Sequence, residues 1–314
     1  MAKLPQRVIG DQTVSCVGLG CMPLSFGHMV DHRDQAIATI HRAIDLGITL
    51  LDTSNIYAPT WDAVGHNEAL VAEAVASYSG PASVTDLLIT TKGGITRGPG
   101  ETWGRDSSAD ALIAACEDSL AQLGVEVIDL YQHHRHDPEQ TYESQMQALA
   151  SLKQRNLIRQ IGLSNVNAAE LSLALDMMGG PADGGIVSVQ NEFSPRFRGD
   201  ADVLDMCTER GIAFLPWSPL GGSDQAKEVG SHYAAFTEVA DEVGASAQEV
   251  VLAWLLHKSS VMIPIPGASK PTTVDSIVRS TSITLSADQF ARLDATTPAQ
   301  SSMYPDDLPR SALR

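Results

Sequence analysis

The feature that most constrains the fold is a regular alternation of helix-like and strand-like segments along the 314-residue chain. Helix-like segments carry apolar residues three or four positions apart, and strand-like segments are short, unbroken apolar runs. Eight strand-like segments occur without an intervening linker, among them residues 48–51, 127–131 and 261–265. Eight such units predict an α/β protein, a (β/α)8 TIM barrel, with residues 1–314 forming a single domain.

Two additions to the barrel are expected. Residues 7–14 contain a Gly10-Asp11 turn signal between β-prone runs, which predicts an N-terminal β-hairpin covering the barrel floor. A helical pattern over residues 287–295 follows the last barrel unit and predicts extra C-terminal helices. A doubly wound open sheet is the alternative fold. That fold normally carries a G-x-G-x-x-G phosphate-binding motif. In the run that begins with Gly18, Pro23 stands where the third glycine of the motif would be.

Composition narrows the possible partners and compartment. The net charge of −17 and a pI near 4.8 argue against binding nucleic acid or an anionic membrane surface. The sequence has no run of about 18 apolar residues, so no membrane span is expected. The first seven residues lack the apolar core of a signal peptide. We therefore expect a cytoplasmic protein with reduced thiols at Cys16, Cys21, Cys116 and Cys207.

Four chemically distinct side chains lie at or just beyond successive strand-like runs. Asp52 ends the second run, Tyr57 follows it, Lys92 ends the third, and His134 follows the fourth. In a parallel barrel these ends meet on one face. An ammonium beside a phenol lowers the pKa of the phenol, an aspartate keeps the ammonium charged, and an imidazole can donate to a carbonyl oxygen. The set predicts proton transfer to a carbonyl group that receives a hydride from another source.

Each residue alone has a simpler interpretation. Asp52 could cap a turn, Lys92 could be a solvated charge, and Tyr57 could pack in the core. Lys92 could also form a Schiff base in a lyase, although Asp52 would keep it charged. The neighbouring His133, His134 and His136 suggest a metal site, but no H-E-x-x-H motif or cysteine pair accompanies them, so no metal is expected.

The loops after the fifth to eighth runs offer hydroxyl, amide, aromatic and cationic groups. A barrel commonly binds phosphate in the loops after its last two strands, at the N-terminus of a helix. Such loops would suit a nicotinamide dinucleotide. The candidate cofactor residues in these loops are Ser164, Asn165, Gln190, Trp217, Ser218, Pro219, Leu220, Gly221, Gly267, Ser269 and Lys270.

The sequence resembles the aldo-keto reductases over nearly its whole length. The matching motifs occur in order at successive predicted strand ends. They are Leu51-Asp52-Thr53-Ser54-Asn55-Ile56-Tyr57, Thr91-Lys92, Ile128-Asp129-Leu130-Tyr131-Gln132-His133-His134-Arg135, Gly162-Leu163-Ser164-Asn165, Gln190-Asn191-Glu192, Trp217-Ser218-Pro219-Leu220-Gly221 and Ile265-Pro266-Gly267-Ala268-Ser269-Lys270.

The resemblance implies a catalytic tetrad and a nicotinamide cofactor bound without a Rossmann domain. The tetrad falls on Asp52, Tyr57, Lys92 and His134; His134 is chosen over His133 because the family histidine stands five residues after the aspartate of the Asp-Leu-Tyr motif. The implied reaction reduces an aldehyde or ketone to an alcohol by hydride transfer, with the tyrosine as proton donor. The resemblance further implies that Ser164, Asn165 and Gln190 hold the carboxamide and that Trp217 stacks on the nicotinamide.

One departure concerns the adenosine end of the cofactor. Many family members carry Arg or Gln and then a Glu-Asn pair on the helix after the eighth strand, where this chain has Thr273, Ser276 and Ile277. The resemblance adds Thr273 to the candidate cofactor residues. Ser269 and Lys270 remain to meet a 2′-phosphate, so NADP(H) is favoured and NAD(H) is the alternative cofactor.

The side chains expected to wall the substrate pocket are large and apolar, which suits a small or medium aldehyde or ketone. The residues expected to line it are Met22, Phe26, Trp61 and Trp103, the last within a glycine-rich loop over residues 93–107. An alternative function on the same barrel is a cofactor-binding regulatory subunit, which can retain an intact tetrad.

Overall fold

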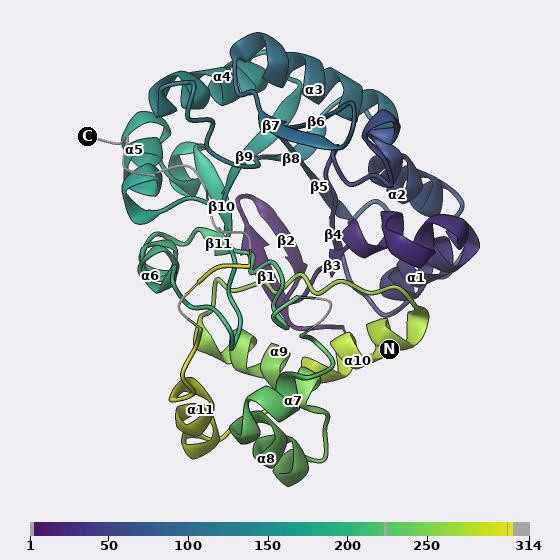
Figure 1. Ribbon diagram of the computed structural model, residues 1–314, viewed down its shortest axis with the longest axis vertical. Helices are drawn as coiled ribbons and strands as arrows, with labels where there is room; N and C mark the ends of the chain where they lie inside the picture. The colour runs from purple at the N-terminus through teal and green to yellow at the C-terminus, as the bar shows by residue number, and fades with distance from the viewer. Residues whose placement is uncertain (1–2, 223–224, 300, 304–314) are drawn as a thin grey trace.

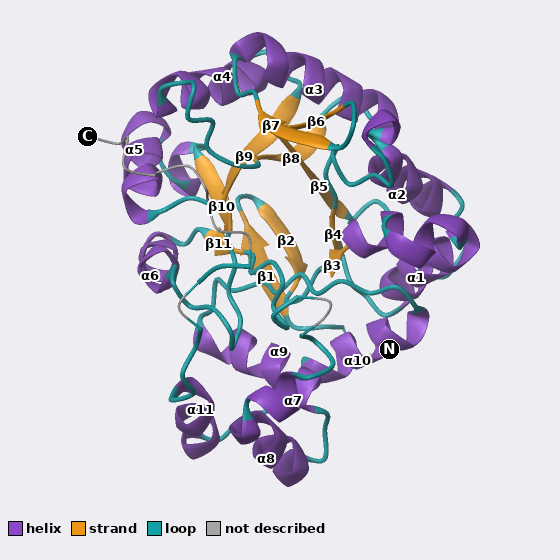
Figure 2. Cartoon of the chain, viewed as in Figure 1, coloured by secondary structure: helices purple, strands orange, loops and turns teal. Residues whose placement is uncertain are grey.

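The computed structural model describes residues 3–222, 225–299 and 301–303 and forms a (β/α)8 barrel, as predicted (Figure 1). Strands form an inner ring and helices surround it, with the N-terminal hairpin seen in the middle of the ring (Figure 2). The barrel strands are β3 (Leu19–Gly20), β4 (Leu50–Asp52), β5 (Leu88–Gly93), β8 (Ile128–His133), β9 (Ile158–Ser164), β10 (Ile186–Gln190) and β11 (Ala213–Phe214).

The barrel helices alternate with the strands, as predicted. Among them, α5 is closed at its start by a capping box, in which the Asn167 side chain accepts from Glu170 N and the Glu170 side chain accepts from Asn167 N. The α-helices are α1 (Arg33–Asp45), α2 (His66–Ala76), α3 (Ala109–Leu123), α4 (Tyr142–Gln154), α5 (Ala168–Met178), α6 (Ala201–Arg210), α7 (Val229–His232), α8 (Ala234–Val243), α9 (Ala247–Lys258), α10 (Pro271–Ser280) and α11 (Ala287–Asp294).

The seven regular strands are parallel and hydrogen-bonded in the order β11-β10-β9-β8-β5-β4-β3. The eighth predicted strand, residues 261–265, is not a regular strand. It joins the sheet through a parallel bridge from Met262 to Phe214 on one side and from Gly267 to Gly20 on the other. Pro264 and Pro266 explain the irregularity, because they accept hydrogen bonds from Gly18 and Gly20 but have no N–H to donate.

The N-terminal hairpin, β1 (Gln6–Ile9) and β2 (Gln12–Ser15), covers one end of the barrel, as predicted. Its Gly10 turn has a φ of +59° and lies against Gln160 and Val187. Ile9 and Val14 belong to the same buried cluster as apolar side chains from inside the barrel. The floor of the barrel is therefore closed by apolar contact, which leaves the carboxyl ends of the strands as the open face.

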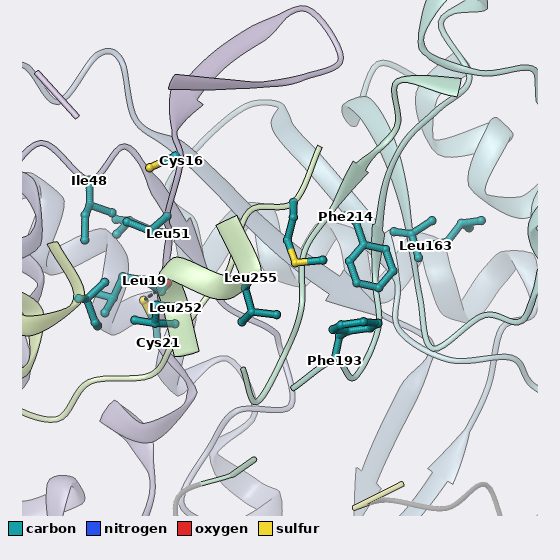
Figure 3. Close-up of a cluster of buried hydrophobic side chains, with 14 of the residues drawn as sticks. Cys16, Leu19, Cys21, Ile48, Leu51, Leu163, Phe193, Phe214, Leu252 and Leu255 are labelled. Carbon is teal, nitrogen blue, oxygen red and sulfur yellow. Dashed lines mark hydrogen bonds between the residues drawn. The ribbon is translucent and has the colours of Figure 1, made fainter. Parts of the chain in front are cut away.

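A second apolar layer lies between the strands and the helices. Phe193 and Phe214 meet edge to face with ring centroids 5.9 Å apart (Figure 3). Trp254 of α9 stacks on Phe193. Fully burying a side chain of this size contributes about 1.5–3 kcal/mol. This layer fixes the strand positions and, through them, the positions of the side chains at the strand ends.

The glycine-rich stretch 93–107, expected to be a loop, contains an antiparallel hairpin. Its strands are β6 (Ile95–Gly98) and β7 (Thr102–Arg105), in register from Ile95 opposite Arg105 to Gly98 opposite Thr102. The β-prone pairs at 95–96 and 102–103, on either side of Gly98-Pro99-Gly100, are the signal for this hairpin. In the described ranges, no helix has the length and apolar character needed to cross a bilayer.

Candidate active site

The centre of the candidate site is a buried ion pair between neighbouring strands. Lys92 Nζ on β5 lies 2.9 Å from both carboxylate oxygens of Asp52 on β4, and it also donates to Thr53 O at 2.7 Å. Burial alone would lower the pKa of Lys92, but Asp52 and the Tyr57 phenol outweigh that effect and raise it. Lys92 is therefore a fixed, charged ammonium and is poorly suited to act as a Schiff-base nucleophile.

Asp52 has further partners on β10 and β8. Gln190 Nε2 donates to Asp52 Oδ1 at 2.8 Å, and Gln132 Nε2 lies 3.5 Å from the same oxygen. Gln132 also donates to Thr90 Oγ1 at 2.9 Å. The buried Asp52 carboxylate therefore has one cationic and two amide partners.

Tyr57 lies beside Lys92 in the loop that follows β4. Lys92 Nζ stands 5.0 Å from the centre of the Tyr57 ring. Loss of solvent around the phenol raises its pKa above the ordinary value, and this outweighs the lowering effect of Lys92. The expectation that Lys92 would bring the pKa below its ordinary value is therefore wrong for the protein without a bound ligand, and the phenol is held in its protonated form.

His134, rather than His133, faces this centre. Its ring meets that of Tyr57 edge to face with centroids 6.0 Å apart, and its Nδ1 lies 3.3 Å from Ser54 Oγ. Burial, with help from Lys92, holds the pKa of His134 well below its usual range, so the imidazole is neutral. His133 Nε2 instead contacts Ser107 Oγ at 2.8 Å, away from Tyr57.

The three histidines of this segment have three different partners. His136 Nδ1 lies 2.7 Å from the buried carboxylate of Glu170, so it shares a partner with neither His133 nor His134. Within residues 3–222, 225–299 and 301–303, no group of three or more His, Cys, Asp or Glu side chains is arranged to hold a metal ion.

The side chains predicted to hold a carboxamide form one connected group. Asn165 donates to Ser164 Oγ at 3.0 Å and to His134 O at 3.0 Å, and Ser164 Oγ donates to Gln190 O at 2.7 Å. Trp217 Nε1 donates to Asn165 Oδ1 at 3.1 Å, which fixes the plane of a partly exposed indole. Hydroxyl and amide groups beside a flat ring fit the carboxamide and ring of a nicotinamide.

The remaining candidate cofactor residues lie on two loops, except Thr273, which lies in the first turn of α10. Ser218 and Gly221 follow β11 with left-handed φ angles of 47° and 83°, and a non-glycine residue in this region marks local strain. Lys270 is exposed and caps the start of α10. Among the other candidates, Gly267 is exposed, Pro219 is buried, and the rest are partly exposed, namely Leu220, Ser269 and Thr273.

Two positions on α10 do not offer an adenine clamp. Ser276 Oγ donates to Glu249 Oε1 at 2.9 Å, and Ile277 is buried in the core. The departure seen in the sequence therefore corresponds to side chains that serve packing and an internal hydrogen bond.

The predicted pocket residues belong to three segments near the site. Met22, in the turn η1 (Met22–Ser25), follows Cys21, whose N–H donates to Asp52 O at 2.8 Å, and Phe26 ends that turn. Trp61 starts the short turn η3 (Trp61–Ala63), and Trp103 lies on β7. Met22, Trp61 and Trp103 are exposed, and their place in a substrate pocket stays a prediction.

Sequence reasoning missed three side chains that support this centre. Gln132 contacts Asp52, Ser54 contacts His134, and Arg97 contacts the backbone on both sides of Tyr57. Ser54 and Gln132 lie within the quoted motifs, so their positions were available. Arg97 lies in the unrecognised hairpin, and its pattern carried no signal for this contact.

Fold and site together define a class: a (β/α)8 barrel whose open face gathers an acid, a phenol, an ammonium and a neutral imidazole. The family model described as Aldo/keto reductase family matches residues 17–297. The chain belongs to this family.

Sequence relatives and solved structures are consistent with this family assignment. The chain is 35% identical over 290 residues to an uncharacterized oxidoreductase of Schizosaccharomyces pombe, covering 91% of this chain and 88% of that protein. It is 31% identical over 296 residues to the pyridoxine 4-dehydrogenase of Escherichia coli, covering 91% and 96%. Its fold is similar to an aldo-keto reductase of Klebsiella pneumoniae solved in complex with NADPH, with a TM-score of 0.78, 22% identity, and coverage of 98% and 100%.

Proposed function

We propose that this protein reduces aldehydes or ketones to alcohols, with NADPH as hydride source and Tyr57 as proton donor. The observation that carries the proposal is the grouping of Tyr57, His134 and the Lys92–Asp52 ion pair on the open face of the barrel. Such a group can polarise a carbonyl and supply a proton as negative charge develops on its oxygen.

Each residue has a distinct part in this mechanism. Tyr57 is protonated at neutral pH and gives its proton to the substrate oxygen. Lys92, charged because of Asp52, stabilises the tyrosinate that remains. His134, which is neutral, donates a hydrogen bond to the substrate carbonyl when its Nε2 carries the proton.

A nicotinamide fits beside this group. Ser164, Asn165 and Gln190 would hold its carboxamide, and the fixed indole of Trp217 would stack on its ring. When bound, the cofactor supplies the hydride that the side chains cannot. NADP(H) is preferred over NAD(H) because Lys270 and Ser269, before the N-terminus of α10, suit a 2′-phosphate.

The proposed substrate is a small or medium carbonyl compound bounded by Met22, Phe26, Trp61 and Trp103. The Escherichia coli relative is named for pyridoxine, so pyridoxal belongs in the test panel as an aromatic aldehyde. The chain's four described cysteines are all free and buried, which is consistent with a reducing compartment such as the cytoplasm.

The direct test follows NADPH oxidation with a panel of aldehydes and ketones. Tyr57→Phe is expected to lower kcat by about 100-fold to 10,000-fold, the range for loss of a proton donor. His133→Ala is the matched control for His134→Ala, because it removes the adjacent imidazole that faces Ser107. Equal activity of wild type and Tyr57→Phe would overturn the assignment of the proton donor.

Cofactor binding is measured separately by NADPH and NADH fluorescence titrations. Lys270→Met is expected to weaken NADPH binding by about 10-fold, the effect of about 1.4 kcal/mol, and to leave NADH binding unchanged. A wild-type protein that binds NADPH tightly but reduces no member of the panel would favour the regulatory-subunit alternative.

A further inference from the structure

The side chain of Arg97 holds the backbone on both sides of Tyr57. Arg97 Nη1 donates to Ile56 O at 3.2 Å and to Ala58 O at 2.6 Å. The Arg97 side chain is only 3% exposed, although it arises from a hairpin on the surface. One guanidinium nitrogen therefore fixes the two carbonyl groups that flank the candidate proton donor.

The same guanidinium also organises the hairpin that supplies it. It forms an ion pair with Glu101 at the hairpin turn and lies 4.7 Å from the ring centre of Trp103 on the facing strand. Glu101 Oε1 in turn accepts from Trp61 N at 3.0 Å. The loop carrying Tyr57, the turn carrying Trp61 and the β6–β7 hairpin are thus joined through Arg97 and Glu101.

Arginine is suited to this arrangement by its planar fork of donors. Its Nη1 can serve the two carbonyls while Nη2 pairs with Glu101 and the flat face stacks on Trp103. A lysine has one ammonium on a flexible stem and cannot make these contacts together. Ile56 and Ala58 are buried, so their carbonyls would have to find other partners if the guanidinium were lost.

We propose that Arg97 is a positioning residue that sets the place of Tyr57 for proton transfer and fastens the β6–β7 hairpin to the loop that carries it. The proposal rests on the proposed carbonyl reduction, in which Tyr57 gives its proton to the substrate oxygen. A displacement of about 1 Å at a reacting group can cost about 100-fold in rate. Contacts that fix the backbone on both sides of Tyr57 can therefore affect kcat strongly.

The test compares Arg97→Met and Arg97→Lys with wild type at saturating NADPH. Arg97→Met is expected to lower kcat by about 100-fold, to leave the NADPH dissociation constant within about twofold, and to increase the solvent isotope effect on kcat. Arg97→Lys, which keeps the charge and one donor group, is expected to recover part of the loss. Arg105→Met is the matched control, because Arg105 lies on the same hairpin and holds His136 O instead.

A double variant separates positioning from general damage. In a Tyr57→Phe background, Arg97→Met should cost little further activity, because the group it positions is already absent. Full additivity of the two losses would overturn the proposal. So would an Arg97→Met enzyme with wild-type kcat and an unchanged isotope effect.

Hydrogen exchange gives a readout that does not need activity. Arg97→Met should speed amide exchange in residues 53–61 while leaving β8 and β9 protected. If wild type reduces no carbonyl compound with NADPH, the proposed function fails, and this measurement still decides whether Arg97 orders the Tyr57 loop. Unchanged exchange over residues 53–61 would overturn the clamp itself.

Discussion

Gln190 Nε2 donates a hydrogen bond to Asp52 Oδ1 at 2.8 Å, joining β10 to β4 across the interior of the barrel. The amide predicted to hold the cofactor therefore also supports the carboxylate that keeps Lys92 charged. One side chain connects the proposed hydride side of the site with its proton side.

Gln190→Leu is expected to weaken both functions. Loss of one hydrogen bond to a buried carboxylate should lower the free energy of unfolding by about 1–3 kcal/mol. Loss of the proposed carboxamide contact should also weaken NADPH binding. Gln132→Leu is the matched control, because Gln132 approaches the same oxygen only to 3.5 Å and is not a proposed cofactor contact. Equal NADPH affinity in the two variants would contradict the dual role.

Ser54→Ala tests how the imidazole of His134 is held. The Ser54 hydroxyl, 3.3 Å from His134 Nδ1, can donate to that nitrogen and so favour the tautomer with its proton on Nε2. We expect kcat to fall by about 10-fold, and imidazole nitrogen NMR shifts to show a larger share of the other tautomer. Ser107→Ala removes the hydroxyl partner of His133 instead and should change neither measurement.

The pH profile of kcat should be flat through the neutral range. Burial holds the pKa of His134 well below its usual 6.5, and loss of solvent raises the pKa of Tyr57 above its usual 10. Both groups therefore keep the protonation states that the mechanism uses between these limits. Initial rates at saturating NADPH and substrate test this. A step near pH 7 would contradict it and point to Glu68, whose pKa burial raises to about 7.

Glu68 should make the protein less stable as the pH rises from 4.5 to 7. Its carboxyl is buried and accepts from Thr91 Oγ1 at 2.5 Å, and burial raises its pKa from 4.5 to about 7. Between these values the folded state keeps a proton that the unfolded state has released, so rising pH favours unfolding. The full cost, roughly 3 kcal/mol, is present above pH 7 and absent below 4.5.

Glu68→Gln should remove this dependence, because a neutral amide can still accept from Thr91. Denaturant unfolding at pH 5 and pH 8 should show the variant gaining on wild type as the pH rises. Glu73→Gln, an exposed change on the same helix, controls for loss of charge. A constant difference between Glu68→Gln and wild type at the two pH values would show that the carboxyl is ionised throughout.

The barrel was predictable because burial on both faces makes its strands continuous apolar runs, as at β4 and β8. Two elements were not. The β6–β7 hairpin is a short surface element whose glycines hide its β pattern, and residues 261–265 are apolar enough for a strand while Pro264 and Pro266 interrupt the ladder. The hydrophobic pattern of a sequence indicates which residues are buried, but it does not show where a strand lacks N–H donors.

Within the site, residue type and place at a strand end predicted that Asp52, Tyr57, Lys92 and His134 would converge. The direction of the Tyr57 pKa was missed, because sequence identifies the neighbouring charge but not the loss of solvent that opposes it. The Arg97 contacts were also missed, because they join main-chain carbonyls to a side chain 39 and 41 positions away and leave no motif.

Pro264 and Pro266 affect the seam that closes the barrel between β3 and residues 261–267. They accept from Gly18 and Gly20 but have no N–H of their own, so at these two positions the seam with β3 gains acceptors and no donors. The seam between β3 and the segment 261–267 ends at the bridge from Gly20 to Gly267. Beyond it, one segment continues to Ser269 and Lys270, and the other continues to Met22. A ligand bound there would tie the two edges together. Each tenfold gain in affinity at a fixed, saturating ligand concentration would then add about 1.4 kcal/mol to the free energy of unfolding.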